Sequence, residues 1–190
     1  MSWPATPPEG LFSIAVDTRE KKPFTFTSVL SHRCEYNESF DGRDPKGLFV
    51  KLQRMTLQAG DYAIATALLL AALERKSLPD FIRCCGSDRD RFFRQVAMLK
   101  GSVEFPLLII EADYSHLEVG GWRGRITPDG ALSTMHTVSN LVPVMLCRSP
   151  GEGERAAFRH LRLAFRSRYR QARRMDKAMK VLDVGGDEQE

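Results

Sequence analysis

The chain has 190 residues, of which 43% are hydrophobic and 27% are charged, as in an ordinary soluble protein that is long enough to bury a core. Its net charge of +4 and isoelectric point of about 9.0 favour polyanionic partners. No apolar run reaches the roughly 18 residues of a membrane span and no signal peptide precedes the domain, so we expect a protein inside the cell with no membrane partner.

Strands and helices are predicted to alternate along the chain. Residues 11–17 form an apolar run that ends at Asp17, and residues 48–53 and 61–65 have the character of strands, whereas residues 69–76 are ambiguous between helix and strand. Residues 105–111 form a buried strand, and residues 141–147 form another. This alternation indicates the α/β class.

Helix starts are marked by capping residues. Ser77 with Asp80, and Ser87 with Asp90, both fit the Ser-x-x-acid capping box. Thr127 before Pro128 predicts the start of a helix that runs to about residue 140, and a long helix is expected over residues 152 to about 175.

Four regions are expected. Residues 1–10, which are rich in proline, form a flexible arm, and residues 11–150 form the α/β domain. Residues 151–178 form a basic amphipathic helix that packs on the domain or on a partner, and residues 179–190 form an acidic tail that we expect to be disordered.

Two carboxylates and a lysine are predicted to meet if residues 61–65 and 69–76 pair as a hairpin. Glu74 and Lys76 would share one face of a strand, and the pairing would bring Asp61 beside Glu74. Such a group suits phosphodiester hydrolysis, because two carboxylates can hold Mg²⁺ and an ammonium can orient the attacking water. Residues 65–72 are strong helix formers, and a helix there would separate Asp61 from Glu74, but we expect tertiary context to favour the hairpin.

Three motifs in this order resemble the nuclease domain of the XPF-type structure-specific endonucleases. They are "VDTREKKPF" at residues 16–24, "AGDYAI" at 59–64 and "ERKSLPD" at 74–80, and the last two carry the family's Gly-Asp and Glu-Arg-Lys-x-x-x-Asp. The resemblance covers about residues 11–150 and implies the restriction-endonuclease-like fold, an α/β fold with a central mixed sheet flanked by helices. No tandem helix-hairpin-helix signature follows Pro150, so the chain looks like the compact stand-alone form of bacteria and their phages.

The resemblance also implies the site. Asp17, Asp61 and Glu74 would be ligands of Mg²⁺, for which Mn²⁺ can substitute, and Lys76 would serve the attacking water. Asp80 would complete the catalytic set. The backbone carbonyl of Arg75 is a further candidate ligand.

Two of these assignments have structural alternatives. Asp80 is explained equally well as the capping partner of Ser77. Asp17 could simply end a strand before a turn. Arg19 and Glu20 are expected to line the same pocket.

Arginines in three regions are candidates for contact with DNA. The helix after residue 151 has eight arginines between Arg155 and Arg174 and no acid among them, which favours phosphate contacts over a solvated face. A parallel apolar stripe that includes Phe158 and Leu161 would dock on the domain or on a second subunit. The candidates for DNA contact are Arg19, Arg89, Arg91, Arg123, Arg125, Arg159, Arg162 and Arg166.

The leading hypothesis is a Mg²⁺-dependent endonuclease that cuts branched, flap or fork DNA in repair or recombination, alone or as a homodimer or heterodimer. The alternative is a non-catalytic DNA-binding or dimerisation subunit of the same fold. A third interpretation is an unrelated α/β protein whose motif is accidental. The resemblance implies a cytoplasmic, nucleoid-associated protein in a bacterium or phage and a nuclear one in a eukaryote.

Overall fold

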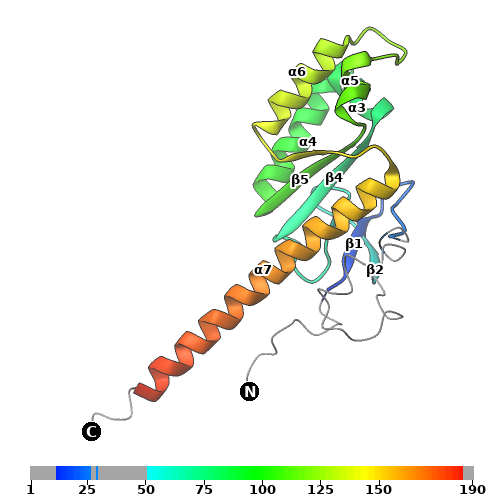
Figure 1. Cartoon of the computed structure of the whole chain (residues 1–190). Helices are drawn as coiled ribbons and strands as arrows, with labels where there is room; N and C mark the ends of the chain where they lie inside the picture. Colours follow the sequence, from blue (N-terminus) through cyan, green and yellow to red (C-terminus); the bar gives the residue numbers. More distant parts are fainter. Residues whose placement is uncertain (1–11, 27–28, 30–50, 186–190) are drawn as a thin grey trace.

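The computed structural model describes residues 12–26, 29 and 51–185 (Figure 1). The predicted arm at residues 1–10, the region from residue 30 to 50 and the last five residues lie outside the described part. Within it, a six-stranded mixed sheet has the order β2-β1-β3-β4-β5-β6, in which β3 runs antiparallel to its neighbours and the other pairs are parallel. The predicted central mixed sheet is confirmed.

The strands and helices have the following bounds. The strands are β1 (Ile14–Asp17), β2 (Leu52–Met55), β3 (Tyr62–Ile64), β4 (Ala71–Ser77), β5 (Phe105–Glu111) and β6 (Val144–Leu146). The helices are α3 (Leu78–Cys85), α4 (Arg89–Ser102), α5 (Tyr114–Val119), α6 (Pro128–Ser139) and α7 (Pro150–Gly185).

One face of the sheet is covered by α7, which runs alongside β4 and β5 in the view of Figure 1 and contacts β3, β4 and β5. Leu73 of β4 and Ile109 of β5 pack here in one apolar cluster with Phe158 and Leu161 of α7. The predicted apolar stripe of α7 therefore docks on the domain itself.

The opposite face is covered by α3, α4, α5 and α6. Leu108 and Ile110 of β5 point to this side, where they pack with Phe81 of α3 and Phe92 of α4. Because successive side chains of a strand alternate between faces, Leu73 and Ile109 join the core under α7, whereas Leu108 and Ile110 join the core on the opposite face.

Residues 65–72 do not form a helix. Tyr62 pairs with Leu73 in an antiparallel hairpin, and the backbone N–H of Phe105 donates to the carbonyl of Leu70 at 2.9 Å, which fixes the hairpin tip to the start of β5. The predicted hairpin is confirmed, because burial of this segment in the sheet outweighs its helix propensity.

The helix starts agree with the capping predictions in two cases of three. The side chain of Ser77 accepts the backbone N–H of Asp80 at the start of α3, and Thr127 caps α6 in the same way. The prediction for Ser87 is wrong. The N-cap of α4 is Asp88, because Ser87 lies in the turn in which the N–H of Asp88 donates to the carbonyl of Arg83 at 3.1 Å.

Helix α7 is longer than predicted. It begins at Pro150 rather than at residue 152 and continues to Gly185, well beyond residue 175. Near its start, buried Glu154 accepts the N–H of Phe26 and, at 3.1 Å, the hydroxyl of Thr25, so the helix also holds the segment that follows β1. Among the described helices, none is both long enough and apolar enough to cross a membrane.

Gly60 is the residue that lets the chain turn into β3. Its φ is +80°, and a Cβ atom there would lie 2.8 Å from the carbonyl oxygen of Leu73. We predict that Gly60→Ala lowers the free energy of unfolding by about 1–3 kcal/mol, because it combines a strained backbone with a clash against β4. Urea denaturation measures the change.

The matched control is Gly101→Ala near the end of α4. A Cβ there meets nothing within 4 Å, so we expect a gain of about 0.5–1 kcal/mol from helix propensity. Equal stability of the Gly60→Ala protein and the wild type would show that the turn tolerates a side chain.

Candidate active site

The predicted site residues come from three adjacent strands at one edge of the sheet. Asp17 is the last residue of β1, Asp61 directly precedes β3, and Glu74 and Lys76 lie in the second half of β4. The backbone N–H of Asp17 donates to the carbonyl of Asp61 at 2.9 Å, and that of Asp61 donates to the carbonyl of Leu73 at 2.8 Å. Asp61 is thus held between β1 and β4 by its own main chain.

Asp61, Glu74 and Lys76 form the electrostatic centre of the site. Glu74 is 7% exposed and forms an ion pair with Lys76. Burial, followed by the charge of Glu74, raises the pKa of Asp61 to about 7. Although burial lowers the pKa of Lys76, the neighbouring Glu74 outweighs it, so that the pKa of Lys76 is raised and its ammonium stays protonated at neutral pH.

Arg75 points to the other face of β4, as its place between Glu74 and Lys76 predicts. Its Nε donates to Glu111 Oε1 at 2.7 Å, its guanidinium lies 4.5 Å from the centre of the Phe24 ring, and its Nη1 donates to the carbonyl of Lys22 at 2.7 Å. Its backbone N–H donates to Asp61 Oδ2 at 2.8 Å. Arg75 therefore fixes the segment after β1 and also orients the Asp61 carboxylate.

Asp17 is 1% exposed, and both of its oxygens are engaged. Oδ1 accepts the backbone N–H and Nε of Arg19, each at 2.7 Å, and Oδ2 accepts Arg19 Nη2 at 3.0 Å and the N–H of Leu57 at 2.8 Å. The side-chain hydrogen bond from Arg19 is the main reason that the pKa of Asp17 falls to about 2. In this structure the charged carboxylate of Asp17 links the end of β1 to the segment after β2 through the N–H of Leu57. Its predicted role as a metal ligand stays a prediction.

Asp80 is held by its neighbours on α3. Its Oδ2 accepts the hydroxyl of Ser77 at 2.7 Å, and Arg83 forms an ion pair with it. Burial raises the pKa of Asp80, but the hydrogen bond from Ser77 and the charge of Arg83 outweigh it, so the pKa is lowered overall. These contacts agree with the capping alternative, and a catalytic role of Asp80 stays a prediction.

The carboxylates offer two ligands to a divalent cation rather than a complete cage. Among the described residues, no group of three or more histidine, cysteine, aspartate or glutamate side chains is placed to hold a metal ion. Mg²⁺ commonly uses one or two carboxylates and completes its octahedron with water and substrate phosphate. Asp61 fits this donor set. Burial and the charge of Glu74 both disfavour its charged form, and a bound cation would offset both effects.

The candidate arginines fall on both faces of the sheet. Arg123 and Arg125 are exposed in the loop after α5, on the side to which Glu74 and Lys76 point. On the same side, Arg89 donates to the hydroxyl of Thr134 at 2.7 Å.

Two further side chains of this layer have structural partners. Arg91 pairs with Asp88 at 2.7 Å. Trp122 packs under its own loop and donates from Nε1 to the carbonyl of Ile126 at 2.7 Å.

The arginines of α7 lie on the other face and do not form one exposed row. Arg159 is exposed and Arg166 is half-buried, but Arg162 is 9% exposed and its guanidinium lies 5.7 Å from the centre of the Phe158 ring. The sequence made Arg162 a candidate for DNA contact because it does not reveal which part of the helix touches the sheet.

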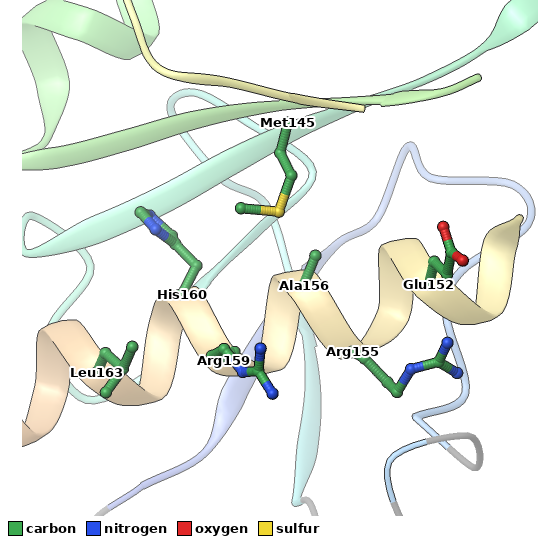
Figure 2. A pocket seen from close by; sticks show the side chains of 7 residues that line it. All are labelled: Met145, Glu152, Arg155, Ala156, Arg159, His160 and Leu163. Carbon is green, nitrogen blue, oxygen red and sulfur yellow. The ribbon is translucent and has the colours of Figure 1, made fainter. Parts of the chain in front are cut away.

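A hollow of about 370 Å³ lies between α7 and the edge strand β6 (Figure 2). Met145 of β6 and Arg155, Arg159 and His160 of α7 line it. Its lining contains none of the predicted catalytic residues, so it is separate from the site at Asp61.

Two further acids contribute to the site, Glu20, which was expected to line the pocket, and Glu111 at the end of β5. Glu20 lies 3.7 Å from Arg75, and its charge adds to the raised pKa of Asp61. Glu111 anchors the Arg75 guanidinium. The position of Glu111 at the end of the buried strand was the available signal.

Comparison with known proteins gives a family and a fold. Residues 16–155 match the ERCC4 domain. The chain is similar to the structure of XPF from Aeropyrum pernix, with a TM-score of 0.56 and 22% identity over 80% of this chain and 61% of that one. It is also similar to XPF from Aeropyrum pernix in complex with DNA, with a TM-score of 0.54 and 21% identity over 81% of this chain and 65% of that one.

The chain spans less than two thirds of the length of either structure. No curated protein matches it. At these identities the likeness establishes the fold, and the predicted restriction-endonuclease-like fold is confirmed.

The raised pKa of Asp61 predicts a pH-dependent difference in stability between Asp61→Asn and the wild type. The neutral carboxyl of Asp61 stabilises the folded state at acid pH, and this contribution is lost as the pH rises from about 4 through about 7. With divalent cations removed, Asp61→Asn should therefore have a higher melting temperature than the wild type at pH 8 and a similar one at pH 4.5. Each kcal/mol of difference in the free energy of unfolding shifts the melting temperature by about 2–4 °C.

Thermal denaturation at both pH values measures the difference, and Glu118→Gln on the surface of α5 is the control. A melting difference that is the same at pH 4.5 and pH 8 would contradict the raised pKa.

Proposed function

The chain belongs to the ERCC4 domain family of XPF-type nucleases, and we propose that it is a Mg²⁺-dependent endonuclease that hydrolyses phosphodiester bonds in branched, flap or fork DNA. The proposal assigns catalysis to Asp61, Glu74 and Lys76. We propose that it acts in DNA repair or recombination. In a bacterium or a phage-infected cell it would be associated with the nucleoid, and in a eukaryote it would be nuclear.

The observation that carries the proposal is the meeting of Asp61, Glu74 and Lys76 at the edge of the sheet. Burying two carboxylates beside one another opposes folding at neutral pH, as the raised pKa of Asp61 reflects. A non-catalytic subunit of the same fold has no use for this arrangement, whereas an enzyme that binds a cation there does. The geometry thus supports the catalytic hypothesis over the alternative of a binding or dimerisation subunit.

The side chains suit the needs of phosphodiester hydrolysis. A bound divalent cation would stabilise charge on the scissile phosphate and lower the pKa of a coordinated water. Asp61 and Glu74 would hold that cation through their carboxylates. Lys76 keeps its proton at neutral pH, so it acts as a cation that orients the water or stabilises developing charge and does not act as a general base.

Arg75 is proposed to position the site rather than to take part in the reaction. Its backbone N–H occupies one oxygen of Asp61, which leaves the other oxygen of that carboxylate for a cation. Its guanidinium is committed to Glu111 and to the carbonyl of Lys22.

Asp17 is proposed as a third ligand that exchanges a partner on DNA binding. Its present partner Arg19 has a side chain that is 69% exposed and is therefore accessible to a DNA phosphate. Transfer of the guanidinium to a phosphate would remove the two side-chain hydrogen bonds on Asp17 and leave one backbone N–H on each carboxylate oxygen, so that each oxygen could also contact a cation.

DNA is proposed to approach the face to which Glu74 and Lys76 point. The DNA-bound relative is XPF from Aeropyrum pernix, and its structure shares the fold of this chain. Arg123 and Arg125 extend from the loop between α5 and α6 on this side. They suit contacts to phosphates, which fix position and shape rather than base sequence.

The assignment of catalytic roles predicts the effects of isosteric substitutions. Asp61→Asn and Glu74→Gln should each slow cleavage of a labelled flap or fork by at least about a hundredfold, because each removes a ligand charge, and Lys76→Ala should act similarly. Asp80→Asn should have a milder effect, since Ser77 still caps α3 through the backbone N–H of residue 80 and the Asn side-chain oxygen can still accept the Ser77 hydroxyl.

The same assay should show dependence on metal. Mg²⁺ or Mn²⁺ should support cleavage, EDTA should abolish it, and Ca²⁺ should support DNA binding without cleavage. Glu118→Gln is the control with full activity. Cleavage in excess EDTA, or normal cleavage by Glu74→Gln, would refute the two-carboxylate mechanism.

The two groups of arginines predict different salt dependences of DNA binding. Arg123→Gln with Arg125→Gln should reduce the slope of log affinity against log salt by about 1.8, since each phosphate contact contributes about 0.9. Arg159→Gln with Arg166→Gln, on the face covered by α7, should reduce it by less than half as much. Fluorescence anisotropy with a forked DNA measures both, and the reverse order would place the DNA on the α7 face.

A further inference from the structure

The second half of α7 projects beyond the sheet (Figure 1). Two contacts show how the helix runs. A Cβ atom on Gly153 would lie 3.6 Å from the side chain of Ile109, and Arg168 forms an ion pair with Glu104 just before β5. Residue numbers thus rise along α7 while they fall along β5, so the part of α7 after Arg168 lies beyond the start of β5.

This projecting part of α7 carries four exposed cations on one side of the helix. At 3.6 residues per turn their side chains lie within an arc of about 100°. Within the described part of the chain, no acidic side chain forms an ion pair with any of them, and the acid among them in the sequence, Asp176, pairs with Lys180 at 2.6 Å. The members of this cationic arc are Arg170, Arg173, Arg174 and Lys177.

The cationic arc points away from the sheet. Arg170 follows buried Leu161 by nine residues, or about two and a half turns, so the two side chains leave the helix in opposite directions. The exposed apolar side chains of this part are Met175 and Met179, and Met179 lies opposite Arg170 by the same count. Two methionines are a small apolar surface beside four cations, so the charge favours a polyanion as the partner.

The cationic arc lies about one turn of duplex DNA from the candidate active site. Gly153 is level with Arg75, because Ile109 is the partner of Arg75 in β5. At 1.5 Å per residue, Arg170 and Lys177 lie about 26 and 36 Å further along α7. Duplex DNA makes one turn of about 10 base pairs in about 34–36 Å. A duplex arm that begins at the candidate active site therefore needs about 8–11 base pairs to reach the cationic arc.

We propose that the cationic arc binds phosphates of a second duplex arm of a branched DNA, about one helical turn from the branch. The inference rests on the proposed action on branched DNA and assigns a surface to one of its arms. Glu74 and Lys76 point to the opposite face of the sheet from α7. One straight duplex does not lie on both faces, whereas two arms that diverge from a branch do. The cationic arc would thereby favour branched DNA over linear duplex.

The dependence of binding on arm length tests the proposal. Two labelled three-way junctions share one arm of about 20 base pairs, and their other two arms have about 20 or about 6 base pairs, on either side of the required length. Fluorescence anisotropy without divalent cations measures both affinities. We expect the shorter arms to weaken binding by the wild type at least about tenfold. In a variant with Arg170→Gln, Arg173→Gln, Arg174→Gln and Lys177→Gln, they should weaken it less than about threefold.

Arg123→Gln with Arg125→Gln is the matched control. It should weaken binding to both junctions and keep the dependence on arm length, because it removes contacts to the other arm. An equal loss of affinity on shortening in the wild type and in the fourfold variant would overturn the proposal. A lower molar mass of the fourfold variant in light scattering would also overturn it, because the cations would then act between copies of the chain.

The binding measurement is independent of catalysis because it contains no divalent cation. Failure of the proposed nuclease function would appear as an absence of cleavage while the dependence on arm length persists. Failure of the present inference would leave cleavage intact and remove the difference between the wild type and the fourfold variant.

Discussion

The antiparallel pairing of β3 with β4 is the interaction on which the candidate site depends. It places Asp61 against the main chain of Leu73 and beside Glu74, and the pairing of β3 with β1 brings in Asp17. The charged form of Asp61 is disfavoured there, and the sheet holds it because Tyr62, Leu73 and their neighbours bury a large apolar surface around it. Core packing thus offsets the electrostatic cost of burying Asp61 beside Glu74. The same arrangement favours a bound cation, which would relieve the repulsion between the two carboxylates.

Successive side chains of the Glu-Arg-Lys segment point to opposite faces of the sheet and have different roles. Glu74 and Lys76 face the layer of α3 to α6, where the proposed substrate face lies, and Arg75 faces the α7 layer. There it joins Glu111, Phe24 and the carbonyl of Lys22 into one support. The three consecutive residues therefore serve two functions, chemistry on one side of the sheet and rigidity on the other.

The sequence was informative where the signal is local. The two-residue spacing of Glu74 and Lys76, the caps at Ser77 and Thr127 and the apolar strands are all set by nearest neighbours along the chain. The signals failed where a partner is remote: the Leu57 N–H that engages Asp17 lies 40 residues away, and the burial of Arg162 depends on how α7 meets the sheet. At Ser87 a plausible cap was overridden by the turn that ends α3.

The central claim is that Asp61 and Glu74 together bind a divalent cation. Calorimetric titration of Mn²⁺ into the protein at pH 7, in two buffers of different ionisation enthalpy, measures both the affinity and the protons released. The account predicts binding with release of about half a proton, since the pKa of Asp61 is about 7, and loss of that binding in both Asp61→Asn and Glu74→Gln. Wild-type protein that binds no Mn²⁺, or an Asp61→Asn variant that binds it equally well, would contradict the account.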